Sequence, residues 1–546
     1  MWPLAFGLSF VLAAGDAGLG LPPPPGDPLA GTYSKRLDFR GGAPIVPVRL
    51  MEGQTEVTFT PRGRARLKVA GDIEKTVESP AGAALKVRLV EGTPAVVSAR
   101  IQLAEFPFVD KAGLAAEQAQ WAERGVATRV QTLGSVYGIA GKVIDNRRYL
   151  LVVDEQLADA DALGKRQAEL LRSFGVRTTL LEKLEKPPRG KLELTDAQGA
   201  PLALADGRIV VETLDGAALD VRRVEYGVGY AFHGFQDRSF RGGLELTVDR
   251  AGHLAVVNLV SLEDLLKGLV PSEIFARAHP EALKAQAVTA RGEVLAKIGL
   301  KHLADPYLLC AEQHCAVYKG LSGEAASTNA AVDATRGEGL FDATGKLVDS
   351  VYSAVCGGHT EDNDVVWGGP PNPSLRGRPD LLPGKSSGTT PKDLPAFLAA
   401  ELPAACRLSS FGQPSKYRWE RRFTAREVDE LTASLKLGRV MAISVADRGV
   451  SGRARLLTLS GELGATQVRG ELNIRKLFAN LNSAMFVVTA ERGPDKKLTG
   501  WLFKGGGWGH GVGMCQTGAI GRAEAGQSYR DILSHYYGGA EAARIY

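Results

Sequence analysis

Two segments of this chain repeat one pattern. In each, an amphipathic stretch ends at a Gly-Val pair, and a stretch in which apolar and polar residues alternate follows directly. QAQWAERGV (118–126) and QAELLRSFGV (167–176) carry these pairs fifty residues apart. The apolar spacing predicts two helices that end at Gly125 and Gly175, because glycine readily adopts the left-handed backbone at a helix end. A strand on each side of each helix completes two strand–helix–strand halves. The sequence therefore predicts a small α/β sandwich over residues 95–184.

This predicted α/β module resembles the SPOR-type peptidoglycan-binding module in the order of its elements. The resemblance implies that the module binds glycan strands stripped of their peptides. No specific ligand-binding motif accompanies the pattern, so an α/β domain without a ligand is the alternative interpretation.

The rest of the chain divides around this module. A chain of 546 residues is too long for a single core, so we expect two or three domains. An apolar run in residues 1–20 is typical of a signal peptide, with a plain hydrophobic N-terminus as the alternative. Residues 21–94 are expected to form a linker and a short β-rich segment, and residues 191–546 alternate like strands before switching to helices. Together these patterns predict a multidomain α+β protein, with a surface insertion near residues 381–415.

Composition narrows the class of partner. Hydrophobic residues make up 44% and charged residues 23% of the chain, as in folded soluble proteins. The net charge of +5 is mildly basic, and no block of six or more Lys and Arg residues occurs. We therefore expect no nucleic-acid partner. A mild positive charge suits an anionic cell-wall polymer.

Two helices are predicted around a carboxylate in the segment VSLEDLLKGLVPSEIFARAHPEALKAQAVTARGEVL. Ser261 begins the first helix, and Pro280 stands in the first turn of the second. Pro271 is expected to break the first helix, because proline removes a backbone donor. Glu273, placed at this break, would face a groove, whereas the alternative is a solvated turn residue.

Five sequence blocks follow one another in an order that resembles the SpoIID/LytB family of peptidoglycan-acting proteins. The resemblance covers residues 191–546. The blocks are VSLEDLLKGLVPSE, ALKAQAVTARGE, STNAAVDATRGEGL, YSAVCGGHTED with a following WG, and GWGHGVGMCQTGA. The resemblance implies a lytic transglycosylase or, for the LytB branch, a noncatalytic wall-binding protein that enhances an amidase.

The resemblance places the catalytic glutamate of a transglycosylase at Glu273. Such an enzyme protonates the leaving glycosidic oxygen, and the 6-hydroxyl of muramic acid then closes a 1,6-anhydro ring. One carboxyl serves as acid and base and contributes about 10²–10⁴-fold to the rate. Burial beside apolar neighbours would raise its pKa enough to keep it protonated near neutral pH. Ser272 is expected to orient Glu273, and Arg291 to hold substrate carboxylates or to lie on a solvated helix face.

The stretch GGGWGHGVGMCQTGA contains seven glycines in fifteen residues. We expect these glycines to let the backbone approach a sugar chain. Trp508 is expected to stack on a pyranose ring, and Gln516 to hydrogen-bond the substrate. His510 has three candidate roles: bonding a sugar hydroxyl, orienting Glu273 or binding a metal. The alternative is a tight turn platform with the histidine satisfied inside it.

The motif SAVCGGHTE resembles a family block that is thought to line the cleft. It makes Ser353, His359 and Glu361 candidate substrate-binding residues. A structural turn is the alternative interpretation.

The cysteines leave two kinds of site open. CAEQHC brings together three residues of the types that bind zinc: Cys310, His314 and Cys315. The resemblance allows zinc near the catalytic glutamate, although a transglycosylase requires no cofactor. The alternatives are free thiols or a disulfide, either Cys310–Cys315 or Cys356–Cys515, with Cys406 as the unpaired thiol.

Three functions remain open from the sequence: a lytic transglycosylase, a noncatalytic amidase enhancer and a metal-dependent hydrolase. The first is favoured because the VPSE block is intact. The expected partners are peptidoglycan glycan strands, peptide-stripped or not, and a cell-wall amidase. The expected location is the periplasm or another part of the cell envelope, after export.

Overall fold

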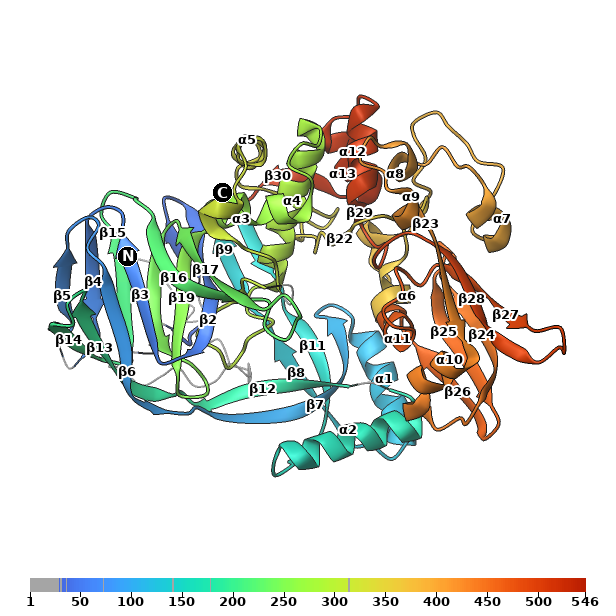
Figure 1. The fold of residues 1–546 in the computed structure, drawn as a ribbon, viewed down its shortest axis with the longest axis horizontal. Helices are drawn as coiled ribbons and strands as arrows, with labels where there is room; N and C mark the ends of the chain where they lie inside the picture. Colours follow the sequence, from blue (N-terminus) through green and yellow to red (C-terminus); the bar gives the residue numbers. More distant parts are fainter. Residues whose placement is uncertain are drawn as a thin grey trace, which may run out of the picture.

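The computed structural model describes most of the chain (Figure 1), namely residues 29, 32–35, 37–71, 73–139, 142–176, 178–312 and 315–546. The predicted signal peptide, residues 1–20, lies outside the described residues, and so does His314. Among the helices of the described part, none combines the length and the apolar character needed to cross a membrane. The fold is a multidomain α+β architecture rich in strands, as the sequence predicts.

Two antiparallel sheets form the β-rich part at the left of Figure 1. The first sheet contains, in order, β1 (Asp38–Arg40), β2 (Ala43–Gln54), β19 (Leu254–Ser261), β18 (Gly243–Val248), β15 (Arg208–Thr213), β4 (Ala65–Val69) and β5 (Lys75–Ser79), with β20 (Leu309–Cys310) parallel to β2. The second contains β14 (Pro201–Asp206), β13 (Arg189–Asp196), β6 (Leu85–Thr93), β3 (Glu56–Pro61), β16 (Leu219–Tyr226) and β17 (Gly234–Phe240). Every residue of β18 is buried, so this strand lies at the centre of the core.

The pairing corrects the domain division expected from the sequence. Strand β2 pairs with β19, and β6 pairs with β13, so residues 21–94 are not a separate segment. Their strands build the same sheets as the start of residues 191–546, and the α/β module of residues 95–184 is inserted between them. Alternation along the chain indicates a strand but does not identify its partner, which explains the error.

The inserted module has the predicted order of elements. They are β7 (Val96–Pro107), α1 (Lys111–Glu123), β8 (Thr128–Leu133), β11 (Arg148–Val153), α2 (Ala160–Phe174) and β12 (Thr179–Lys186). The strands form an antiparallel sheet in the order β12-β7-β11-β8. Gly175 ends α2 in the left-handed conformation, with φ of 68°. A hairpin of β9 (Val136–Ile139) and β10 (Lys142–Asp145) joins the module to the rest, because the Tyr137 hydroxyl donates to the Leu295 carbonyl at 2.7 Å.

Helices occupy the upper centre of Figure 1 and carry all or part of four of the five family-like blocks, whereas YSAVCGGHTED begins on a short strand. They are α3 (Leu262–Glu273), α4 (Pro280–Lys297), α5 (Ala326–Ala334), α12 (Gln516–Glu524) and α13 (Tyr529–Tyr536). Short strands lie among them: β21 (Glu338–Phe341) with β30 (Glu541–Arg544), and β22 (Tyr352–Ser353) with β29 (Met514–Cys515). Ser261 caps α3 by accepting from the Asp264 backbone N–H at 3.1 Å, as predicted.

The expectation that Pro271 breaks the first helix is wrong. Helix α3 includes Pro271 and ends at Glu273. The proline lies in the last turn, and the Ile274 N–H still donates to the Val270 carbonyl at 3.1 Å. Pro271 lacks the N–H that would bond the Lys267 carbonyl, and the helix continues for only two residues beyond it.

Residues between 419 and 503 form a second core at the right of Figure 1. One sheet contains β23 (Arg418–Thr424), β28 (Leu498–Gly506) and β27 (Phe486–Arg492), and another contains β24 (Val440–Arg448), β25 (Ala454–Gly461) and β26 (Gly464–Arg469). Helices α10 (Ala425–Leu431) and α11 (Glu471–Leu477) pack with them, and α6 (Asn363–Trp367) lies nearby in Figure 1. Short 3₁₀ turns occur at Gly320–Gly323, Pro373–Leu375 and Ala433–Leu435.

The expected surface insertion near residues 381–415 is partly buried. It forms α7 (Leu394–Ala399) and α8 (Ala405–Leu408) and leads into α9 (Pro414–Tyr417). Phe397, Leu402 and Cys406 belong to the main core, and α8 packs against α12. The turn-rich composition predicts loops correctly but does not reveal these buried anchors.

Candidate functional site

Glu273 lies at the C-terminal end of α3, where it lines a small cavity of about 100 Å³. The other lining residues are Ile274, Phe275, Ala354, Val355, Gln413, Lys416, Gln516, Thr517 and Ile520. They come from the VPSE block, the SAVCGG block, the segment before β23 and the start of α12. The structure thus brings the sequence-predicted glutamate together with Gln516, 243 residues away.

The environment of Glu273 favours its protonated form. Burial raises the pKa of its carboxyl to about 7, and the nearby charge of Glu293 adds to the rise. A hydrogen bond from the Tyr352 hydroxyl and the charge of Lys297 oppose the rise. A carboxyl with this pKa can both give and take a proton near neutral pH.

Gln516 fixes the main chain at the catalytic candidate. Its Nε2 donates to the Glu273 carbonyl oxygen at 2.8 Å and to Gln286 Oε1 at 3.2 Å. Gln286 is fully buried in α4. The contact therefore fixes the end of α3 against α4 and the start of α12.

His510 acts within the protein through its neutral ring. Its Nε2 lies 2.9 Å from the Tyr352 carbonyl oxygen, while its Nδ1 accepts from the Val512 N–H at 3.1 Å. These contacts select the tautomer protonated at Nε2, and burial lowers the pKa of His510 to about 3. His510 therefore supports Tyr352, which in turn contacts Glu273; it is not part of either Cys/His/acid cluster in the described residues.

The glycines of residues 505–518 serve close packing inside the protein, which corrects the expected approach to a sugar. A Cβ on Gly511 would lie 2.3 Å from the Arg453 guanidinium carbon, and one on Gly513 would lie 2.1 Å from the Val351 carbonyl oxygen. Both glycines have positive φ, 81° and 68°. The bare backbone thus lets this segment fit tightly against its neighbours.

Exposed aromatic rings surround the cavity region. Trp508 is 40% exposed, and the Lys416 ammonium lies 5.0 Å from its ring centre. Phe275 is 45% exposed and stacks on Phe411 with 4.9 Å between ring centres. Trp367 is 55% exposed and lies 5.0 Å from the His510 ring. Flat apolar faces with open access are suited to stacking on pyranose rings.

The three candidates of the SAVCGGHTE motif are buried, which favours their structural interpretation. His359 Nδ1 lies 2.7 Å from the Thr360 carbonyl oxygen, and burial lowers the His359 pKa. Glu361 accepts from Ser451 Oγ at 2.6 Å, and burial raises its pKa. Ser353 is buried as well, and its Oγ has no hydrogen-bond partner in the described part of the chain. None of the three lines the cavity at Glu273.

Arg291 also differs from its expected role. It is fully buried, and its Nε and Nη2 donate to the two carboxylate oxygens of Glu263 at 2.9 and 2.8 Å. Its Nη1 donates to the Glu338 carbonyl at 2.9 Å. These bonds occupy the guanidinium, so Arg291 cannot hold substrate carboxylates in this arrangement. Ser272 lies beside Glu273 in α3 and is partly buried, but it is not one of the residues that line the cavity.

A candidate metal centre forms around two of the three predicted ligands. Cys310 Sγ and Cys315 Sγ lie 2.7 Å apart, and His302 Nε2 lies 3.1 Å from Cys315 Sγ. His302 Nδ1 contacts Asp305 Oδ2 at 2.9 Å, the kind of support that orients a histidine ligand. The two thiols and the imidazole are the kinds of donor that bind zinc, but the sulfurs would have to separate from 2.7 Å to about 3.8 Å around one tetrahedral ion. His302 was not among the predicted ligands because it lies eight positions before Cys310, outside the CAEQHC segment.

The other cysteines are free thiols, which is one of the two expected alternatives. Cys356 and Cys515 form no disulfide; the Cys356 N–H instead donates to Cys515 Sγ at 3.1 Å. Cys406 is not isolated, since its Sγ lies 3.7 Å from Cys356 Sγ in the same buried region. Cys406 is an unpaired thiol, as expected, and the packing of α8 against α12 brings it into this region.

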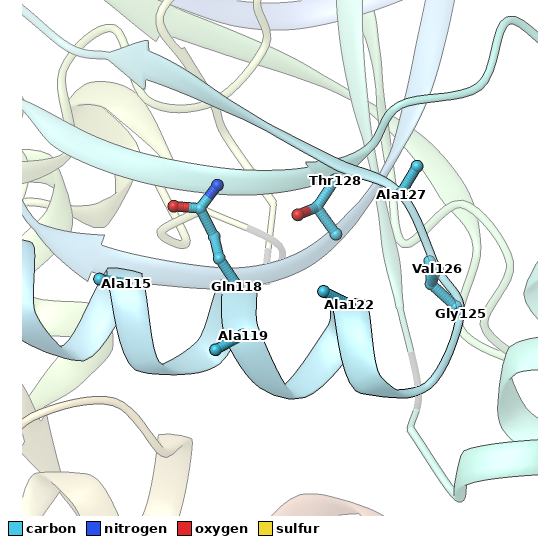
Figure 2. A pocket seen from close by; sticks show the side chains of 8 residues that line it. All are labelled: Ala115, Gln118, Ala119, Ala122, Gly125, Val126, Ala127 and Thr128. Atoms are coloured by element: carbon cyan, nitrogen blue, oxygen red, sulfur yellow. The ribbon is translucent and has the colours of Figure 1, made fainter.

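A second depression, of about 660 Å³, lies on the α/β module between α1 and β8. Figure 2 shows Gln118 and Ala122 on the helix beside Thr128 of the strand. The lining is mostly alanine, with Gln118 and Thr128 as the polar side chains. Such a surface is open and carries few groups that would select a ligand.

Several site residues escaped the sequence analysis. Glu293 and Gln286 lie on α4 seven residues apart, a spacing that places both on one helix face. Both residues belong to the ALKAQAVTARGE block itself, and that membership together with the spacing was the available signal. Tyr352 directly precedes the SAVCGG block, whereas nothing local marks Lys416 as a neighbour of Trp508.

Comparison with known proteins gives two family-model matches. Residues 250–341 match the model described as stage II sporulation protein (SpoIID), and residues 361–513 match a domain of unknown function, DUF8618. The SpoIID match contains α3 and α4, and therefore Glu273.

Three relatives extend the match. An uncharacterized protein of Brachyspira hyodysenteriae is 28% identical over 339 residues, which cover 61% of this chain and 76% of that protein. The amidase enhancer of Bacillus subtilis is 28% identical over 302 residues, 50% of this chain and 39% of the relative. Stage II sporulation protein D of Bacillus amyloliquefaciens is 26% identical over 314 residues, which cover 55% of this chain and 78% of that protein. Residues 250–341 thus form a SpoIID domain, and the longer region around it is similar to proteins of the SpoIID/LytB family.

Proposed function

We propose that this protein is an exported lytic transglycosylase that cleaves the glycan strands of peptidoglycan, with Glu273 as its acid and base. The observation that carries the proposal is the raised pKa of Glu273, about 7, at the edge of a cavity. The SpoIID match and the similarity to stage II sporulation protein D support a role at the cell wall.

The proposed reaction uses one carboxyl twice. Protonated Glu273 donates its proton to the glycosidic oxygen as the bond to the anomeric carbon of muramic acid breaks. The resulting carboxylate then takes the proton of the muramic acid 6-hydroxyl as that oxygen attacks the same carbon. The products are a free sugar hydroxyl and a 1,6-anhydro ring, and no water is consumed. Glu273 ends the cycle protonated again.

The surrounding residues have supporting roles in this proposal. Gln516 holds the main chain of Glu273, and Tyr352 stabilises the carboxylate that forms midway. Trp508 and Phe275 offer exposed rings on which sugars would stack. A zinc ion held by His302, Cys310 and Cys315 would act structurally, by fixing the loop that follows α4 against β2, and no reaction step needs it.

The α/β module would add a second contact with the wall. We propose that the depression between α1 and β8 binds glycan, as the likeness to SPOR-type modules implies. The support is the order of elements together with the location of the depression on an exposed face. The test compares how much of a Gln118→Ala variant and of the parent protein is pulled down with peptide-free glycan. Equal amounts would remove this depression from the proposal.

A noncatalytic role is the second candidate, because one of the relatives is named an amidase enhancer. In that case Glu273 would contribute to binding, and the protein would stimulate an amidase without cleaving glycan itself.

One assay separates these functions. Purified protein is incubated with peptidoglycan and, in parallel, with glycan stripped of peptides, and the products are analysed by mass spectrometry. Anhydro-muramyl ends are expected from the parent protein and not from a Glu273→Gln variant of unchanged circular dichroism. Reducing ends would indicate a hydrolase. No products, together with stimulation of an added amidase, would establish the enhancer and remove the transglycosylase.

A further inference from the structure

Four metal-binding side chains from four separate segments meet in the core, away from the predicted metal centre. They form the thiol–carboxylate cluster: Cys356 after β22, Asp380 after the turn Pro373–Leu375, Cys406 in α8 and Cys515 at the end of β29. All four residues are buried, and their ligand atoms lie within 4.8 Å of one another. Neither the glycan chemistry nor the SpoIID match at residues 250–341 involves them.

The spacing of these atoms suits a tetrahedral ion. Zinc binds thiolate sulfur at about 2.3 Å, so two sulfurs on one tetrahedral ion are about 3.8 Å apart. Cys356 Sγ lies 3.7 Å from Cys406 Sγ and 3.1 Å from Asp380 Oδ2. A small adjustment would therefore place one ion between all four donors. Three sulfurs and one oxygen favour zinc over harder cations, which prefer oxygen alone.

Asp380 is held so that one of its oxygens faces the sulfurs. Its Oδ1 accepts from Arg522 Nε at 2.9 Å and from the Tyr536 hydroxyl at 2.9 Å, while His535 Nε2 lies 3.5 Å away. These three groups occupy Oδ1 and leave Oδ2 directed at Cys356. Partners of this kind orient carboxylate ligands in metal sites, and the charge of Arg522 would offset part of the negative charge of three thiolates.

Cys515 receives two backbone N–H groups on its sulfur. The Cys356 N–H lies 3.1 Å and the Gly518 N–H 3.3 Å from its Sγ, at the N-terminus of α12. Both N–H groups hold the sulfur in place beside the other three side chains. Gly518 is required here, since a Cβ on it would lie 2.3 Å from Asp380 Oδ2 and from the Tyr536 hydroxyl. The backbone thus leaves room for the cluster.

We propose that the thiol–carboxylate cluster is a structural zinc site with three sulfur ligands and one carboxylate oxygen. Binding releases the three thiol protons to solvent and forms three Zn–S bonds and one Zn–O bond. The site goes beyond the proposed glycan cleavage and does not depend on it.

The position of the site indicates its purpose. Ala354 and Val355 directly precede Cys356, and Gln516 and Thr517 directly follow Cys515, so both ligand segments continue into the wall of the Glu273 cavity. Cys406 lies on the short helix before Gln413 and Lys416, which also line that cavity. An ion at the cluster would join these three segments and keep this wall of the Glu273 cavity rigid.

The test uses the full chain with Cys310→Ser and Cys315→Ser, which leaves this cluster as the only thiol site. The double variant is produced with added zinc, dialysed against a chelator and analysed for metal and by X-ray absorption. We expect about one zinc per chain, with three sulfurs at about 2.3 Å and one lighter ligand. Adding Cys406→Ser should lower the bound zinc to near zero.

Other outcomes would overturn the site. A double variant without zinc whose intact mass is two hydrogens low would show a disulfide in place of the ion. If the double variant holds no zinc and three thiols titrate after unfolding, the three cysteines are reduced side chains that pack in the core without a metal. Zinc with fewer than three sulfur ligands, or zinc that survives Cys406→Ser in a folded protein, would place the metal elsewhere. The X-ray absorption measurement is made on the double variant, in which the cluster is unchanged. It therefore remains decisive even if the Cys406→Ser protein misfolds.

Discussion

The Gln516 side chain donates a 2.8 Å hydrogen bond to the backbone carbonyl of Glu273, across 243 residues of sequence. The bond joins the start of α12 to the end of α3, and it is made by the residue that follows the buried Cys515. The proposed acid is thus positioned through its main chain by the glycine-rich segment, and its carboxyl takes no part in that bond.

Replacing Gln516 with methionine should therefore slow glycan cleavage without changing the acid itself. Methionine keeps the length of the side chain but loses both hydrogen bonds. We expect a fall in kcat of about 10- to 100-fold, the usual effect of a displaced catalytic group. The pH at which the rate declines should stay where it is in the parent protein. Gln413→Met, on the same cavity but without a contact to Glu273, is the matched control and should have a smaller effect. An equal loss in both variants would argue against positioning.

The pH dependence of cleavage should report the Glu273 carboxyl. The proposed acid must be protonated, so the rate should decline above about pH 7, roughly tenfold per pH unit. Glu293→Gln removes a like charge that raises this pKa, so the decline should begin at lower pH. Initial rates of anhydro-end formation between about pH 5 and pH 9 would measure both profiles. A Glu293→Gln profile that moves upward would contradict the proposed electrostatics.

Tyr352→Phe should move the same profile in the other direction. The tyrosine hydroxyl stabilises the carboxylate form, so its loss raises the pKa of Glu273 and extends activity to higher pH. The Tyr352 carbonyl that accepts from His510 is unchanged, which keeps the glycine-rich segment in place. The maximal rate should also fall, because the carboxylate formed midway loses a donor. If the profiles of both variants coincide with that of the parent protein, neither group acts on Glu273.

The sequence predicts the parts of this fold that depend on local patterns. The Gly175 helix end, the Ser261 cap and both helices of the α/β module follow from spacing and from residue type within a few positions. Glu273 and Gln516 were also identified, but through family-like blocks and not through physical reasoning about either residue. The raised pKa of Glu273 followed from the apolar residues beside it.

The parts that were missed depend on contacts between distant segments. Pairing of β2 with β19 joins residues about two hundred positions apart, which alternation cannot reveal. The meeting of Cys356, Cys406 and Cys515 has the same origin. The glycines were recognised as unusual, yet only the positions of Arg453 and Val351 show that they serve internal packing.

Arg291 offers a test of the same distinction, since its helix position suggested substrate binding and its burial indicates a structural role. Arg291→Ala leaves Glu263 charged and buried without its partner, which should lower the free energy of unfolding by about 3–5 kcal/mol. Urea unfolding followed by circular dichroism would measure the loss. An Arg291→Met, Glu263→Leu double variant removes both charges and should recover much of the stability, because an apolar pair of similar size fills the space. Below its unfolding temperature the double variant should still bind peptide-free glycan as the parent does. A stable Arg291→Ala protein with weakened glycan binding would instead restore the substrate-binding interpretation.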